Sequence, residues 1–153
     1  MIVSERIAHV SNRFYDAVRS GKAREAHEWA TKGSLDALAG HKYCLVTTFK
    51  RSGDPVSTPV WFGLADGKLY FRTYADAVKL KRLRRNPRAL VGPCDVRGNP
   101  KGPMIEAAAR HLPPEEEEPA ERAIQSNYGL FRRIYEGSFA MKVAGAYVEV
   151  RPT

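Results

Sequence analysis

Apolar residues in the middle of the chain recur in short runs that are typical of β-strands. These runs are rich in β-branched and aromatic residues, and turn-forming residues separate them. We predict strands over residues 43–49, 56–64, 69–73, 88–94 and 103–111. Residues 139–143 and 146–150 are predicted to close the chain as a β-hairpin or a bent strand.

Other segments space their apolar positions three or four residues apart, which indicates helices. The pattern predicts a helix over residues 4–20, a short helix over 22–31 and one further turn at 35–38. A long helix to about residue 135 follows Pro113 and Pro114, because proline fits a first helical turn. The glutamates at 115–118 then complement the helix dipole, so we interpret them as a first turn and not as a metal site.

The segment 55–88 joins a hairpin to a short basic helix. Its turn, at residues 65–68, contains Asp-Gly between apolar runs, which is a strong hairpin signal. Asp76 is the predicted helix N-cap and Pro87 ends the helix. Lys79 falls in the first turn, where backbone N–H groups and the helix dipole favour an anion.

This order of elements predicts one domain over residues 1–153, mainly β with peripheral helices (α+β). Short turns join most of the strands, so we expect an antiparallel sheet that can close into a barrel. Pro59 lies within a predicted strand and has no N–H for a ladder, which favours a strand edge or a bulge. Such an edge either leaves backbone groups facing a ligand or is simply irregular.

The net charge is +8, and much of it lies between residues 79 and 88, where no acidic residue occurs. A basic surface suits nucleic acid, anionic lipid or a polyanionic small molecule. A charge run alone is most simply a solvated helix face. Its position beside the predicted anion site favours a ligand instead.

Catalytic and metal-binding motifs are absent from the sequence. No nucleophile elbow, P-loop or dinucleotide-binding glycine motif occurs. The histidines are not spaced as metal ligands; they are His9, His27, His41 and His111. We interpret Cys44 and Cys94 as reduced core thiols. With a charged N-terminal segment and no membrane-spanning apolar run, we expect a cytoplasmic protein.

Several residues in the segment 57–79 suit the binding of a flat ring system that carries a phosphate. The strand residues 57–61 offer backbone groups, Thr73 offers a hydroxyl at a strand end, and Lys79 offers a cation. A bound cofactor of this kind carries the chemistry, while the protein binds and orients it. No titratable side chain is then required to act as acid or base.

The runs TPVWF, LYFRT, KLKRLRRNPR and PCDVRG together resemble a known family. They are similar to split-barrel flavin and deazaflavin oxidoreductases related to pyridoxamine 5′-phosphate oxidase, and to the branch that uses coenzyme F-420 above all. Tyr128-Gly129-Leu130 and the final VEVRP also resemble that branch. The resemblance covers residues 35–153 as the barrel core, and residues 1–34 are an added N-terminal helical segment.

The resemblance implies an FMN-binding-like split β-barrel that forms a homodimer with the cofactor at the interface. The positions it assigns to cofactor binding are Ser57, Thr58, Pro59, Val60 and Trp61 at the ring system, Arg72 and Thr73 near the ribityl-phosphate, and Lys79 at the phosphate. Ala77 departs from the pattern, because relatives place Ser or Arg there. The missing bond to a charged group is worth ~1.5–3 kcal/mol, and Arg82 is the neighbouring cation that can compensate.

The branch resemblance implies a reductase that transfers hydride from reduced coenzyme F-420 to an unsaturated or quinone-like small molecule. Coenzyme F-420 carries a phosphodiester and an oligoglutamate tail, which suits the basic excess. The alternatives are an FMN-dependent oxidoreductase of the same superfamily and a non-catalytic flavin- or deazaflavin-binding protein. Pyridoxamine-phosphate oxidase activity itself is not expected, because that subgroup's substrate-phosphate residues are not recognised near the C-terminus.

A nucleic-acid-binding β-barrel is a further alternative that the charge and the tyrosines would allow. The aromatic residues, however, are mixed into core-like strand positions, and no nucleic-acid-binding motif is present. We therefore expect neither a nucleic acid nor a membrane as a partner.

Overall fold

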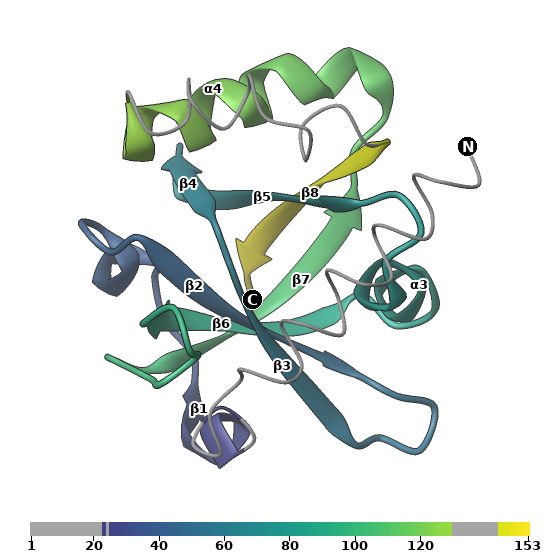
Figure 1. Ribbon diagram of the computed structural model, residues 1–153. Helices are drawn as coiled ribbons and strands as arrows, with labels where there is room; N and C mark the ends of the chain where they lie inside the picture. The colour runs from purple at the N-terminus through teal and green to yellow at the C-terminus, as the bar shows by residue number, and fades with distance from the viewer. Residues whose placement is uncertain (1–22, 24, 130–143) are drawn as a thin grey trace.

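The computed structural model describes residues 23, 25–129 and 144–153 of the chain. Its main feature is an eight-stranded sheet (Figure 1). The strands are β1 (Ala30–Thr31), β2 (Tyr43–Phe49), β3 (Pro55–Val60), β4 (Phe62–Ala65), β5 (Lys68–Tyr74), β6 (Arg88–Cys94), β7 (Met104–His111) and β8 (Gly145–Pro152). Their order is β3-β2-β6-β7-β8-β5-β4, with β1 paired to β7 outside this path. All of these pairings are antiparallel except that of β1 with β7, so the predicted mainly β, antiparallel fold is confirmed.

The sheet closes on itself because its two edge strands follow one another in the chain. β3 and β4 lie at opposite ends of the strand order, and only Trp61 separates them. In Figure 1 they form one continuous run that crosses from one edge of the sheet to the other. The predicted single strand over 56–64 is therefore wrong at Trp61, where the chain exchanges one neighbouring strand for another. The prediction that Pro59 occupies an edge strand is confirmed.

The hairpin between β4 and β5 forms at the predicted turn. Ala65 pairs with Lys68, and both intervening residues have positive φ angles, 54° at Asp66 and 75° at Gly67. Two consecutive residues with positive φ are what a two-residue hairpin loop of this twist requires. The sequence signal therefore placed this turn correctly.

The described helices are η1 (Ala26–Trp29), η2 (Asp36–Leu38), α3 (Val78–Arg85), η3 (Pro114–Glu116) and α4 (Glu117–Tyr128). The prediction that Asp76 is the N-cap of α3 is wrong. The Ala77 N–H donates to Tyr74 O, so a turn extends to Ala77, and this residue, in an extended conformation, becomes the N-cap. The predicted short helix over 22–31 is described only in part: residues 23 and 25 are helical, a 3₁₀ turn follows over Ala26–Trp29, and the chain then enters β1.

Besides residues 22 and 24 of the predicted short helix, three predicted segments fall partly or wholly outside the described residues. They are the helix over 4–20, the continuation of α4 from 130 to 135 and the strand over 139–143. Within the described part, α4 ends at Tyr128 and Gly129 is its C-cap residue, with a φ of 55°. No described helix has the length and apolar character needed to cross a bilayer.

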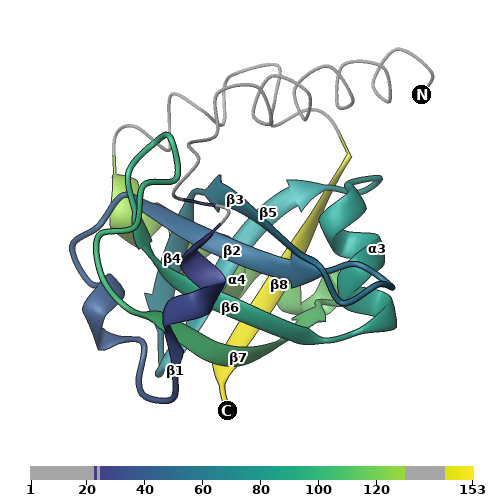
Figure 2. The ribbon, with the colours of Figure 1, turned by 90° about the horizontal axis from the view of Figure 1, so that it is seen from below.

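The apolar residues form an inner core and two outer layers. The inner core fills the barrel, and Leu80 and Leu83 of α3 extend into it. One outer layer lies where η1 and β1 cross the face formed by β2, β6 and β7 (Figure 2). The other lies beneath α4, which covers β4, β5 and β8. Cys44 and Cys94 are buried and not bridged, as predicted.

Candidate functional site

The predicted ring-binding stretch on β3 presents its side chains to two faces. Ser57 and Pro59 are buried on the outer face, where the Ser57 hydroxyl lies 2.6 Å from Thr47 Oγ1. Thr58 and Val60 are half-buried, and Val60 packs against the inner core. Strand geometry makes this alternation unavoidable. A ligand lying along β3 would therefore contact the whole stretch mainly through the backbone of this strand.

Trp61 lies at the crossing between β3 and β4, and its ring packs on α4. It stacks on Tyr128 with the ring centroids 4.5 Å apart and the planes inclined by 17°. Offset stacking of this kind adds stabilisation beyond burial of the two rings. The structure thus gives Trp61 a packing contact on its own chain.

Arg72 and Thr73 are consecutive on β5 and face opposite sides of the sheet. Thr73 is buried on the same side as Leu69 and Phe71 of the inner core, whereas Arg72 is half-buried on the outer side. The Arg72 guanidinium lies directly against Gly145 of β8. A Cβ at Gly145 would stand only 2.2 Å from Arg72 Nη2. The absence of a side chain at Gly145 is therefore what makes room for this cation.

Helix α3 begins shortly after β5 and carries Lys79 and Arg82, both half-buried. Its N-cap residue makes no side-chain cap hydrogen bond, and its first turn contains no acidic residue. No carboxylate within the first turn opposes the positive end of the helix dipole, although Asp76 directly precedes the N-cap residue. The backbone N–H groups at a helix N-terminus favour an anion such as a phosphate.

The C-terminal end of α3 approaches the beginning of β3. Arg85 Nη2 donates to the Phe49 carbonyl at 2.9 Å, and Phe49 pairs with Pro55, the first residue of β3. Helix α3 thus links the end of β5 to the start of β3. Through Arg85 the helix contacts the end of β2 that pairs with the start of β3, and the cofactor contacts of the nine predicted residues stay predictions.

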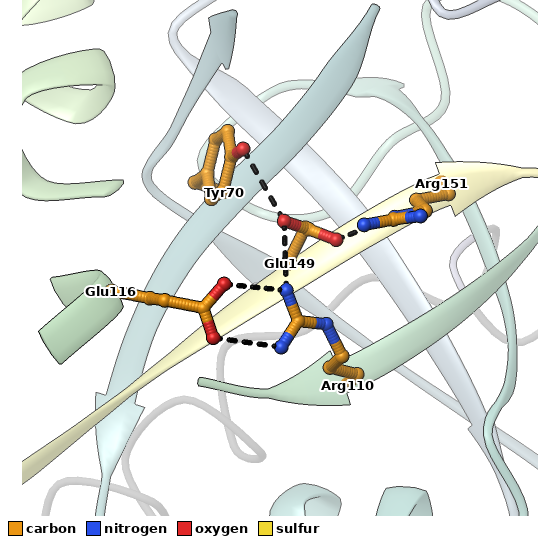
Figure 3. A network of polar contacts seen from close by, with 5 residues as sticks. All are labelled: Tyr70, Arg110, Glu116, Glu149 and Arg151. Atoms are coloured by element: carbon orange, nitrogen blue, oxygen red, sulfur yellow. Dashed lines mark hydrogen bonds and ion pairs between the residues drawn. The ribbon is translucent and has the colours of Figure 1, made fainter. Parts of the chain in front are cut away.

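The sequence did not predict a charged network on the outer face of β5, β7 and β8 (Figure 3). Buried Glu149 accepts from Arg151 Nε at 2.6 Å, from Arg110 Nη2 at 3.3 Å and from the Tyr70 hydroxyl at 3.4 Å. Glu116 holds Arg110 through both of its guanidinium Nη atoms, at 2.9 and 3.0 Å. Burial raises the pKa of Glu149, but the two arginines outweigh this, and the net pKa is lowered. The network fastens η3 to the barrel.

A second unpredicted group lies at the C-terminal end of α4. The Tyr128 hydroxyl accepts from Phe62 N at 2.8 Å and donates to Lys42 O at 2.6 Å. Asn127 Nδ2 donates to His41 O and to Phe62 O, both at 3.0 Å. These side chains form hydrogen bonds with backbone atoms that are far away in the sequence. A local sequence motif therefore could not predict these bonds.

The described residues contain no cluster of His, Cys, Asp or Glu that could hold a metal ion. Among the histidines, His111 instead lies 3.3 Å from Arg84 Nη2 through its Nδ1 atom, and His9 is outside the described part.

Comparison with known proteins agrees with this fold. The family model described as "Pyridoxamine 5'-phosphate oxidase" matches residues 31–149. No curated protein matches the sequence closely enough to count as a relative.

Solved structures share the fold at low sequence identity. An F-420 reductase is 19% identical, with a TM-score of 0.55 over 80% of this chain and 95% of its own. An FAD-binding protein of Mesorhizobium loti is 17% identical, with a TM-score of 0.57 over 77% and 86% of the two chains. A heme-binding protein of Mycobacterium smegmatis is 17% identical, with a TM-score of 0.57 over 88% and 52%.

Proposed function

The chain belongs to the pyridoxamine 5'-phosphate oxidase family, and on this premise we propose that it is an oxidoreductase that uses reduced coenzyme F-420. This family belongs to a superfamily of split barrels that bind flavins and deazaflavins. The proposed acceptor is an unsaturated or quinone-like small molecule.

The observation that carries the choice of cofactor is the charge of helix α3. Its eight residues, VKLKRLRR, include five cations and no acid, and its N-terminus lacks a side-chain cap. A phosphodiester with an oligoglutamate tail is more anionic than FMN, so it gains more from this concentration of positive charge. FMN remains the second candidate, because the same helix end also suits a single phosphate.

We assign the binding roles by element. Lys79, Arg82 and the first turn of α3 would hold the phosphate, with Arg72 and Thr73 beside it. The β3 stretch from Ser57 to Trp61 would support the ring system. When bound and reduced, coenzyme F-420 supplies a hydride to the acceptor. The protein's own contribution is to bind and orient both molecules, and we assign no side chain as proton donor.

We further propose that two copies of the chain form a homodimer with the cofactor between them. The proposal extends the family's arrangement to this chain, and β3 supports it. This strand is at one end of the strand order, so one of its edges is not used in the intrachain sheet of the described residues. An edge of this kind can face a ligand or a second protomer.

Titration of the purified protein with coenzyme F-420 and with FMN, followed by fluorescence, tests the cofactor. We expect saturable binding that is tighter for coenzyme F-420. Tight FMN binding without a response to the deazaflavin would reverse the choice. Oxidation of reduced coenzyme F-420 with a panel of quinones and unsaturated acceptors then tests the activity, and binding without any turnover would favour a sequestering protein.

A further inference from the structure

The barrel has a split where the chain passes from β3 to β4. The last pair of β2 with β3 joins Cys44 to Val60, and the first pair of β4 with β5 joins Phe62 to Phe71. Trp61, between them, belongs to neither ladder. The backbone N–H and carbonyl of Phe62, next to Trp61, have their partners outside these two ladders.

Asn127 and Tyr128 supply these partners from the end of α4. Together they bond the N–H and the carbonyl of Phe62 on one side of the split. On the other side they bond the carbonyls of His41 and Lys42, immediately before β2. The Lys42 ammonium in turn donates to the backbone carbonyl of Asn127. The two sides of the split are thus tied through a single helix end.

The same helix end also fixes the orientation of Trp61. Its indole ring stacks on the Tyr128 ring, and Tyr128 is only 8% exposed. The Lys42 ammonium lies 5.6 Å from the centroid of that phenol ring. A buried ring that is anchored through its hydroxyl at two backbone atoms is a rigid platform for a stacked neighbour.

We propose that Asn127 and Tyr128 form a clamp that holds Trp61 and the adjoining β3 residues in the geometry that receives the cofactor ring. Tyr128 is then a positioning residue, which acts through Trp61 and the β3 backbone. This inference rests on the proposed function. Its physical basis is preorganisation, because a binding strand that is already ordered loses less conformational entropy when the ligand binds.

The test compares Tyr128→Phe with Tyr147→Phe in a Trp29→Phe background, in which Trp61 is the only tryptophan of the chain. Tyr147 is a matched control. It is also buried beneath α4, and its hydroxyl donates to Glu121 at 2.6 Å, but it does not bond the split. Dissociation constants for coenzyme F-420 and FMN are measured by fluorescence, together with acrylamide quenching of Trp61.

We expect Tyr128→Phe to bind the preferred cofactor about tenfold more weakly than the parent protein, which corresponds to about 1.4 kcal/mol. Acrylamide quenching of Trp61 should increase in the same variant. Tyr147→Phe should change neither quantity appreciably. Equal dissociation constants and equal quenching in the two variants would overturn the inference.

Two further outcomes are also decisive. If the parent protein binds neither cofactor, the proposed function fails; increased quenching in Tyr128→Phe then still supports the clamp on Trp61, and unchanged quenching overturns it. If Tyr128→Phe loses its far-ultraviolet circular dichroism, Asn127→Ala replaces it. This variant removes the side-chain bonds to the His41 and Phe62 carbonyls and the contact of Lys42 Nζ with Asn127 Oδ1, and we expect the same direction of change.

Discussion

Gly145→Ala should displace the Arg72 guanidinium while leaving its charge in the protein. The added Cβ would lie 2.2 Å from Nη2, 2.3 Å from Cζ and 2.5 Å from Nε of Arg72. Non-bonded heavy atoms attract best at about 3.5–4.0 Å, so the guanidinium must retreat by more than about 1 Å. All three atoms are at the end of a flexible side chain, which can rotate away without moving the backbone.

The Gly145→Ala variant should therefore bind the cofactor more weakly while keeping nearly the same stability. Replacing a glycine in a strand by alanine contributes about 0.5–1 kcal/mol through reduced conformational freedom, which offsets the rearrangement of Arg72. Loss of a hydrogen bond from Arg72 to the cofactor phosphate should cost about 1.5–3 kcal/mol, which weakens binding roughly 10- to 150-fold. The melting temperature should change little.

The assay is fluorescence titration with coenzyme F-420 in a double-mutant cycle that combines Gly145→Ala and Arg72→Ala. Because both changes remove the same interaction, Gly145→Ala should have little further effect once Arg72 is absent. Wild-type affinity in Gly145→Ala would refute the placement of Arg72 beside the phosphate. Fully additive losses would show that Gly145 acts by another route.

Three other substitutions test separate parts of the account. Lys79→Ala should weaken binding of coenzyme F-420 about tenfold, whereas Lys101→Ala, in an exposed loop, should not; equal titration curves would remove the phosphate assignment. Gly63→Ala would place a Cβ 2.1 Å from the backbone oxygen of Ala123 and should lower the unfolding free energy by about 1–3 kcal/mol, and an unchanged urea midpoint would contradict this packing. Glu149→Gln should flatten the acid side of the pH–stability curve: the lowered pKa of Glu149 means that its contribution is present above the unfolded value of about 4.3 and is lost as the pH falls. An unchanged acid limb in urea unfolding would show that this carboxylate is not the group responsible.

The strands that the sequence predicted correctly are those whose signals are local. β2 and β6 have the predicted bounds, because compact apolar runs flanked by turn residues define them. The turn at Asp66 and Gly67 was also predictable, since its backbone conformation depends on those two residues. Local chemistry thus identified most of the sheet.

Features that depend on tertiary context were not predictable in this way. The interruption at Trp61 arises because β3 pairs with β2 and β4 pairs with β5. Asp76 has the chemistry of an N-cap, yet the turn that ends at Ala77 places the helix start one residue later. In both cases the surrounding fold outweighed the local preference of the sequence.

In the candidate site, too, the features with local sequence signals were predictable and those that depend on tertiary contacts were not. The sequence located the basic helix and the lysine in its first turn, because charge and capping patterns are visible in one dimension. The contact of Arg72 with Gly145 joins two strands that are adjacent only in the folded barrel. The backbone bonds made by Asn127 and Tyr128 involve acceptors 86 residues away. Only the fold brings these groups together.

A crystal structure of the protein with coenzyme F-420 tests the central claim most directly. The account predicts the phosphate at the N-terminus of α3, within hydrogen-bonding distance of Lys79, and the ring system along β3 from Ser57 to Trp61. It also predicts that a second protomer completes the site. A cofactor bound elsewhere on the barrel, with Lys79 and β3 not in contact with it, would contradict the account.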